Sequence, residues 1–190
     1  MNKTIESYRE VTKECSDLFE KKLIDYGSSW RVLRTPSVTD QIYIKAARIR
    51  SIQELEETKV DEGQESEFIG IVNYCIIALI QHCYPVSLNE IENQKSTYNP
   101  GYCMRLYKIY LERAFELMEQ KNHDYGEAWR DLRITSITDL ILQKLLRVKQ
   151  IEDNKGGTIV SEGLEANYLD ILNYAVFSLI LLKEESNGRV

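Results

Sequence analysis

Apolar residues recur every three or four positions along most of the chain, which is the spacing of one face of an α-helix. The segment 137–148 shows this pattern clearly. Its apolar side carries Ile137, Ile141, Leu142, Leu145, Leu146 and Val148. Its opposite side carries Asp139, Gln143, Lys144 and Arg147. A helix of this kind buries one side and leaves the other to water or to a ligand.

Each half of the chain contains two further helical segments. The first segments, 5–24 and 103–122, are amphipathic, and each leads into Asp-Tyr-Gly, where Gly27 or Gly126 can take the left-handed conformation that ends a helix. The third segments, 65–82 and 165–184, are mostly apolar, which suits the centre of a bundle. We therefore predict an all-α fold.

The second helices are predicted to begin at Ser37 and Ser136. An aspartate, Asp40 or Asp139, follows each serine after three residues. In such a capping box the serine caps the backbone and the acid reaches back to it. We interpret both aspartates as caps rather than ligands.

The helical pattern occurs twice. A shift of 99 residues aligns 22–52 with 121–151 without a gap, and both copies contain Lys-x-x-Asp-Tyr-Gly-x-x-Trp-Arg. After one inserted residue, Asn73-Tyr74 aligns with Asn173-Tyr174. Each copy alone is small for a stable unit. We therefore predict two tandem three-helix repeats, packed as a pseudo-twofold helical bundle, that form a pseudo-dimer within one chain. The predicted boundaries are 1–84 for the first repeat, 85–101 for the linker and 102–190 for the second repeat.

The composition is that of a globular protein, with 43% hydrophobic and 28% charged residues. The net charge of −6 disfavours direct binding to nucleic acid or to an anionic membrane, because both usually require a basic face. The apolar run 69–80 is broken by Asn73 and is too short to span a bilayer, and the segment 1–20 is polar. We expect a cytoplasmic protein with reduced cysteines, since its 4 cysteines form no Cys-x-x-Cys pair.

Asp170 and Asn173 interrupt the otherwise apolar third segment of the second repeat. A buried carboxylate needs a cation, a metal ion or a hydrogen-bond donor beside it. Glu162 and Glu165 lie just upstream, and several carboxylates together suit Mg²⁺. We predict a Mg²⁺ site at Glu162, Glu165 and Asp170, with Asp170 and Glu165 as candidate catalytic residues. Alternatively, the two glutamates only favour the N-terminus of the helix.

Lys144 and Arg147 occupy the polar side of the second helix, and Lys45 and Arg48 repeat them in the first copy. Two cations one turn apart can clamp a phosphate chain, and an arginine can do so with two hydrogen bonds. The alternative is a charged face that only contacts water.

The glycine turn of the second repeat gathers charged and aromatic residues that could hold a base by stacking and a phosphate by charge. These candidate substrate-binding residues are Lys121, Asp124, Tyr125, Trp129 and Arg130, and Asn173 on the third helix joins them. The structural alternative is that Gly126 ends the helix, Trp129 fills the core and Asp124 pairs with an arginine. His123 is replaced by Ile24 in the first copy, which disfavours it as an essential base.

The two copies differ at the acid on the third helix, because Gly70 stands where the second repeat has Asp170. Glu62, Glu65 and Asn73 are still present in the first repeat. We therefore predict a degenerate acidic site in the first repeat, and we assign any catalysis to the second.

The combined motif Lys-x-x-Asp-Tyr-Gly, Lys-x-x-Arg and Glu-x7-Asp-x-x-Asn-Tyr resembles the nucleotide modification associated domain 1 family. The matching positions are Lys121, Asp124, Tyr125, Gly126, Lys144, Arg147, Glu162, Asp170, Asn173 and Tyr174. The resemblance implies an association with nucleotide metabolism. More distantly, the acidic helix is similar to that of MazG-like all-α nucleoside triphosphate pyrophosphatases, which bind Mg²⁺ with helix-borne carboxylates. Gln143 and Lys144 stand where paired glutamates are expected in that family.

We therefore expect a protein that binds a nucleotide or a related phosphorylated metabolite together with Mg²⁺. Pyrophosphate hydrolysis is the expected reaction if the chain is an enzyme. Two alternatives stay open: a non-catalytic nucleotide-binding or regulatory module, and a purely structural interaction protein. Further association into a homo-oligomer is also open.

Overall fold

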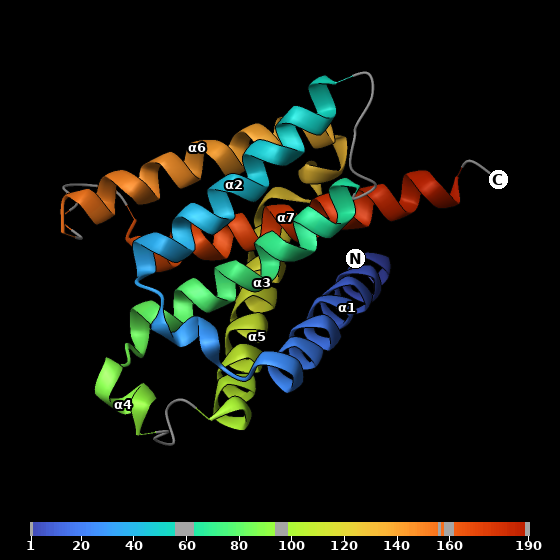
Figure 1. The fold of residues 1–190 in the computed structure, drawn as a ribbon. Coiled ribbons are helices and arrows are strands. Elements are labelled where there is room, and N and C mark those ends of the chain that lie inside the picture. The colour runs from blue at the N-terminus through green and yellow to red at the C-terminus, as the bar shows by residue number, and fades with distance from the viewer. Residues whose placement is uncertain (1, 56–62, 94–98, 156, 158–161, 189–190) are drawn as a thin grey trace.

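The chain folds into helices joined by short connections (Figure 1). The computed structural model describes residues 2–55, 63–93, 99–155, 157 and 162–188. The first repeat contains α1 (Asn2–Tyr26), the short 3-10 helix η1 (Ser29–Val32), α2 (Thr35–Glu54) and α3 (Gln64–Cys83). The short helix α4 (Leu88–Glu92) lies in the predicted linker. The second repeat contains α5 (Pro100–Tyr125), η3 (Ala128–Asp131), α6 (Ile134–Asp153) and α7 (Leu164–Asn187). Because these described residues include no strand, the all-α prediction is confirmed.

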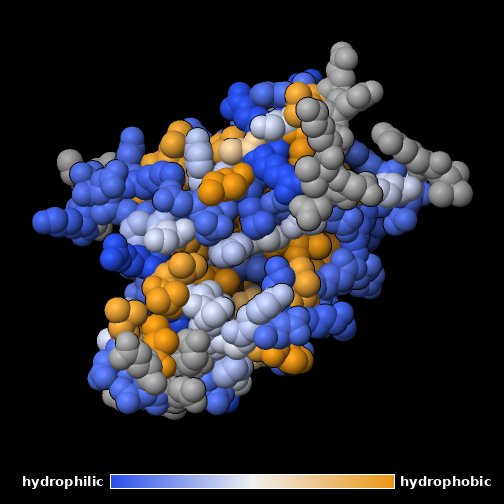
Figure 2. Space-filling model, viewed as in Figure 1, coloured by the Kyte–Doolittle hydropathy of each residue, from blue (hydrophilic) through white to orange (hydrophobic). Residues whose placement is uncertain are grey.

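The two third helices, α3 and α7, form the centre of the molecule. They pack against each other, with α2 and α6 on one side and α1 and α5 on the other (Figure 1). Figure 2 shows a largely hydrophilic surface over α2 and α6 and hydrophobic residues in the hollow between α1 and α3.

Among the described helices, α3 is long and apolar enough to cross a membrane, but 67% of that stretch is buried inside the protein. The apolar composition of α3 is therefore explained by its place in the core.

Glycines end the first helix of each repeat, as the sequence predicts. Gly27 directly follows α1 with a φ of +61°, and Gly126 directly follows α5 with a φ of +64°. Residues with side chains rarely adopt this conformation, whereas glycine adopts it without steric penalty. Each turn leads into a short 3-10 helix that contains Trp30 or Trp129. The Trp129 ring stacks on Phe177 of α7, and the Trp30 ring lies beside Phe19 of α1.

The predicted capping boxes are wrong. Helices α2 and α6 begin before Ser37 and Ser136, and their N-cap residues, Arg34 and Arg133, make no side-chain cap. In α2 the early start has a physical reason, because Pro36 has a backbone angle that is already set for the first helical turn.

The two aspartates assigned to these capping boxes reach the other repeat instead. Asp40 pairs with Lys149 at 2.7 Å, and the equivalent Asp139 lies 3.6 Å from Arg50. Each ion pair joins α2 to α6, so these acids connect the repeats rather than cap their own helices.

The predicted apolar side of α6 is correct except at its edge. Ile137, Ile141, Leu145 and Val148 are fully buried, as predicted. Leu146 is 53% exposed, so its placement on the buried side was wrong. The reason is geometric. Helix α6 packs on α7 and α2, and these two helices cover a narrower strip of α6 than the apolar side that the sequence predicts.

Two equivalent hydrogen bonds join the repeats in the core. The Tyr8 hydroxyl of α1 donates to Asn173 Oδ1 of α7 over 2.7 Å. The Tyr107 hydroxyl of α5 donates to Asn73 Oδ1 of α3, also over 2.7 Å. Each bond runs from the first helix of one repeat to the third helix of the other. Such reciprocal contacts are what pseudo-twofold packing requires, although that arrangement and the exact repeat boundaries stay predictions.

Glu152 lies in a partly buried polar contact between the repeats. Its Oε1 accepts hydrogen bonds from Thr39 Oγ1 over 2.8 Å and from the Tyr168 hydroxyl over 3.1 Å. Burial raises the pKa of the Glu152 carboxyl above its ordinary value of 4.5. The equivalent position in the first repeat is Gln53, whose amide donates to Thr138 over 3.0 Å. The first repeat therefore builds the same contact without a charge.

We expect Glu152→Gln to stabilise the protein at neutral pH. An acid whose pKa is raised by folding contributes stability at low pH and loses it as the pH rises through the folded pKa. The uncharged amide removes that loss, so the free energy of unfolding at pH 7.5 should rise by up to about 1 kcal/mol. Urea unfolding of both proteins at pH 4.5 and pH 7.5 measures this. A difference between the proteins that is the same at both pH values would contradict the prediction.

Candidate functional site

Asp170 connects three helices of the second repeat. Its side chain on α7 is only 10% exposed, and one carboxylate oxygen lies on each of two lysines. Lys121 Nζ of α5 is 2.5 Å from Oδ1, and Lys144 Nζ of α6 is 2.7 Å from Oδ2. A buried carboxylate requires a cation beside it, and here the chain itself supplies two.

An aromatic pocket of about 240 Å³ lies beside this ion-pair cluster. The indole ring of Trp129 stacks on Phe177 with ring centres 4.2 Å apart. Tyr125 is 75% exposed at the rim. The polar residues that line the pocket are Lys121, Asn122, Asp170 and Asn173, and Tyr174 is a further aromatic residue. The structure therefore brings together five of the residues predicted from the sequence: Lys121, Tyr125, Trp129, Asp170 and Asn173.

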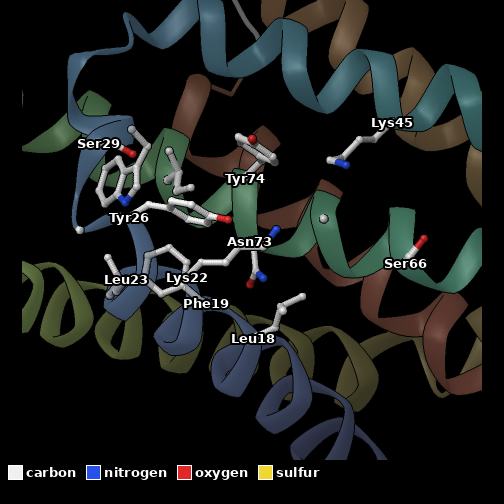
Figure 3. A pocket seen from close by; sticks show the side chains of 14 residues that line it. Leu18, Phe19, Lys22, Leu23, Tyr26, Ser29, Lys45, Ser66, Asn73 and Tyr74 are labelled. Atoms are coloured by element: carbon white, nitrogen blue, oxygen red, sulfur yellow. The ribbon is translucent and has the colours of Figure 1, made fainter. Parts of the chain in front are cut away.

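An equivalent pocket of about 300 Å³ occurs in the first repeat (Figure 3). Its lining repeats the positions of the second pocket, with Lys22, Tyr26, Gly27, Trp30, Gly70, Asn73 and Tyr74. Lys45, one of the predicted binding residues, also lines it. A Cβ atom placed on Gly70 would lie 2.6 Å from Lys45 Cε, so this lysine crosses the space that the acid side chain takes in the other repeat. Lys22, Tyr26 and Trp30 are not among the site residues predicted from the sequence, although the repeat indicates them, because they align with Lys121, Tyr125 and Trp129.

The first repeat holds its buried acid one helical turn earlier. Glu67 of α3 has a side chain that is 5% exposed, and it pairs with Lys45 at 3.1 Å and Arg48 at 2.6 Å. Asn167 occupies the equivalent position in α7 and donates to the backbone carbonyl oxygen of Gly163 over 2.9 Å. Glu67 does not line the pocket. Glu67 is not among the residues predicted from the sequence, although a glutamate followed directly by apolar residues indicates a buried acid as Asp170 does.

The predicted Mg²⁺ ligands do not come together as a metal site. Glu165 pairs with Arg113, Glu162 is exposed, and Asp170 uses both oxygens on lysines. In the described part of the chain, no group of three or more His, Cys, Asp or Glu side chains is placed to hold a metal ion. Mg²⁺ binds carboxylates that are open to it and to its waters. This donor set does not fit Mg²⁺, and the predicted metal site stays a prediction without geometric support. Glu62 lies outside the described residues.

Three other predicted binding residues serve the fold or face water. Arg130 pairs with Glu127 at 2.7 Å and with Glu184 at 2.9 Å, and its guanidinium lies 4.5 Å from the centre of the Trp129 ring. Asp124 is exposed beside His123 rather than paired with an arginine. Arg147 is exposed on α6 and does not line the pocket.

Both the oxygen and the nitrogen of the Asn173 amide bond to groups inside the protein. Its Oδ1 accepts from Tyr8, and its Nδ2 donates to the carbonyl oxygen of Ala114 over 3.0 Å. Asn73 accepts from Tyr107 in the same way. Both asparagines reach their pockets, so the hydrogen bonds that join the repeats also fix one wall of each pocket.

Comparison with known proteins agrees with the duplication. The family model described as nucleotide modification associated domain 1 matches residues 22–82 and 121–182. Each matched segment begins at the pocket lysine, Lys22 or Lys121, and extends into the third helix of its repeat. No curated protein and no solved structure gives a match, and the similarity to MazG-like enzymes stays a prediction. Because the two segments cover more than half of the chain, the protein belongs to the nucleotide modification associated domain 1 family and carries its domain twice.

Proposed function

We propose that this chain binds a phosphorylated small molecule of the nucleotide class in a pocket lined by lysine and aromatic side chains. One observation carries the proposal: two lysines from different helices reach the same point on the third helix, beside aromatic rings. In the second repeat the group between them is the Asp170 carboxylate. Two ammonium groups that hold a carboxylate have the spacing and charge to hold a phosphate oxygen in its place.

The shape of the pockets supports a small ligand with a flat apolar part. Volumes of about 240 and 300 Å³ lie at or below the lower end of the range for small-molecule sites. In the first pocket the rings of Tyr26, Trp30 and Tyr74 offer surfaces on which a base can stack. Since the chain as a whole carries a charge of −6, attraction of an anion depends on these local lysines.

We propose binding without hydrolysis, because Asp170, the carboxylate predicted to be catalytic, forms ion pairs with two lysines. A purely structural role is the competing function, and the contacts of Arg130 and Asn173 favour it, because other groups of the chain occupy both side chains.

A thermal-shift titration separates the two functions. The panel contains nucleoside mono-, di- and triphosphates, the matching nucleosides and inorganic phosphate, each with Mg²⁺ and with EDTA. At a ligand concentration about 100 times its Kd, a true ligand raises the melting temperature by roughly 5 °C or more. We expect nucleotides to do so and nucleosides to do so weakly or not at all. A panel in which nothing shifts the melting temperature would contradict the proposal and favour the structural role.

A further inference from the structure

We infer that the two pockets are not equivalent: the first repeat binds the phosphate of a nucleoside monophosphate, and in the second repeat Asp170 occupies the place of that phosphate. The inference rests on the proposed function and reverses the assignment made from the sequence. There, loss of the acid at Gly70 suggested a degenerate first site. In the structure, the same loss leaves the first pocket open to an anion.

In the second pocket, the carboxylate of Asp170 neutralises the charge of the lysines. Asp170 accepts from Lys121 and Lys144, and it lines the pocket. A phosphate that entered would meet the negative charge of Asp170 and would have to break the two short ion pairs of a carboxylate side chain that is 10% exposed. Both effects oppose binding of an anion there.

Among the described residues, the lining of the first pocket contains cations and no Asp or Glu. Lys22 makes no hydrogen bond or ion pair with any residue that the structure describes. Figure 3 shows the side chains of Lys22 and Lys45 extending from different helices toward the part of α3 that carries Asn73 and Tyr74. Lys45 keeps Glu67 as a partner at 3.1 Å, but an ammonium group has two further hydrogens with which it can bind a ligand.

The local charge matches one phosphate monoester. Two lysines, Lys22 and Lys45, line the pocket and bring two positive charges to it. The Glu67 carboxylate lies outside the lining and divides its contacts between Lys45 and Arg48. A phosphate monoester carries about −1.5 to −2 at pH 7. The volume of about 300 Å³ and the surrounding aromatic rings leave room for little beyond one nucleoside. A nucleoside monophosphate therefore fits better than a triphosphate, which would bring two further phosphate groups.

Reciprocal substitutions at the acid position test the inference. The probes are AMP, GMP, CMP and UMP, measured by isothermal titration calorimetry on the full chain. We expect one site per chain for at least one probe. Gly70→Asp should weaken binding of that probe at least about tenfold, because the new carboxylate forms ion pairs with the pocket lysines. The three atoms nearest to the added Cβ all belong to the flexible end of Lys45, which can move aside, so the variant should fold. Conversely, Asp170→Gly should create a second site, and Asp170→Asn serves the same test if the glycine weakens α7 too far.

A matched pair of lysine variants tests the contact itself. Lys22→Met should weaken binding of the probe at least about tenfold. Lys21→Met removes the same charge from the neighbouring exposed residue, which does not line the pocket, and should leave the affinity unchanged. If both variants weakened binding of the probe equally, the effect would come from the net charge of the protein rather than from a contact with Lys22. That result would overturn the inference.

Tryptophan fluorescence locates the bound probe. The chain has 2 tryptophans, and each lines one pocket. In Trp129→Phe the remaining Trp30 should report binding. In Trp30→Phe, at a probe concentration at which calorimetry still detects binding, the remaining Trp129 should not. A response from Trp129, or two sites in the unchanged protein, would overturn the inference and leave the proposed function standing. Absence of binding by every probe in both this test and the thermal-shift panel would defeat the proposed function as well.

Discussion

Replacing Asp170 by alanine should lower the free energy of unfolding by about 3 kcal/mol, because it leaves a buried ammonium group without its counter-charge. The Lys144 side chain is 14% exposed and pairs with Asp170 at 2.7 Å. Lys121 is 48% exposed and can turn toward water once the carboxylate is gone. The expected loss therefore comes mainly from Lys144. Urea unfolding at pH 7 measures it.

Two further variants separate this effect from a general loss of packing. The double replacement Asp170→Leu with Lys144→Met should recover most of the loss, since an apolar pair can stabilise such a position as well as an ion pair does. Glu67→Ala removes the corresponding acid of the first repeat. Its partners Lys45 and Arg48 are 26% and 34% exposed, so we expect a smaller loss, about 1–2 kcal/mol. A loss below about 1 kcal/mol for Asp170→Ala would show that the ion pairs contribute little.

The features that were predictable from the sequence depend on residues close together along the chain. The duplication, the three main helices of each repeat and the glycines that end α1 and α5 are of this kind. Periodicity and left-handed glycine turns are local properties, so they can be recognised before any packing is known. The requirement of Asp170 for a partner could also be predicted, because it follows from burial alone.

The identity of that partner could not be predicted. A metal ion and two lysines satisfy a buried carboxylate equally well in principle, and the choice depends on how closely α5, α6 and α7 approach one another. The same applies to Asp40, whose local sequence resembles a cap but which pairs with Lys149 of the other repeat. Comparison of the repeats gave Gly70 as a lost acid, and only the three-dimensional arrangement shows Lys45 crossing that space.

Substitution of Asn173 by alanine is the second change with a large expected effect. Asn173 accepts from the Tyr8 hydroxyl and donates to the Ala114 carbonyl oxygen, so its loss leaves the hydroxyl without a partner and the carbonyl with only its hydrogen bond within α5. An unpaired buried hydroxyl costs about 1–3 kcal/mol and the lost bond to the carbonyl about 1 kcal/mol, so we expect a total loss of about 3 kcal/mol. Burial raises the pKa of the Tyr8 phenol, so this side chain stays a neutral donor.

Asn73→Ala provides the matched control in the other repeat. Asn73 accepts from Tyr107 over 2.7 Å. In the described residues it makes no second hydrogen bond comparable to that between Asn173 and Ala114. Its removal should therefore cost less, about 1–2 kcal/mol. Equal losses for the two alanine variants would mean that the Ala114 contact adds nothing to stability.

A double-mutant cycle then isolates the contact between the repeats. Tyr8→Phe removes only the hydroxyl, and its combination with Asn173→Ala should show a coupling of about 1 kcal/mol. Because this hydrogen bond joins α1 of the first repeat to α7 of the second, its loss should also increase amide hydrogen exchange in α1. Exchange that increases equally in every helix would instead indicate global destabilisation, and the Tyr8–Asn173 bond would then have no particular role in docking α1 on the second repeat.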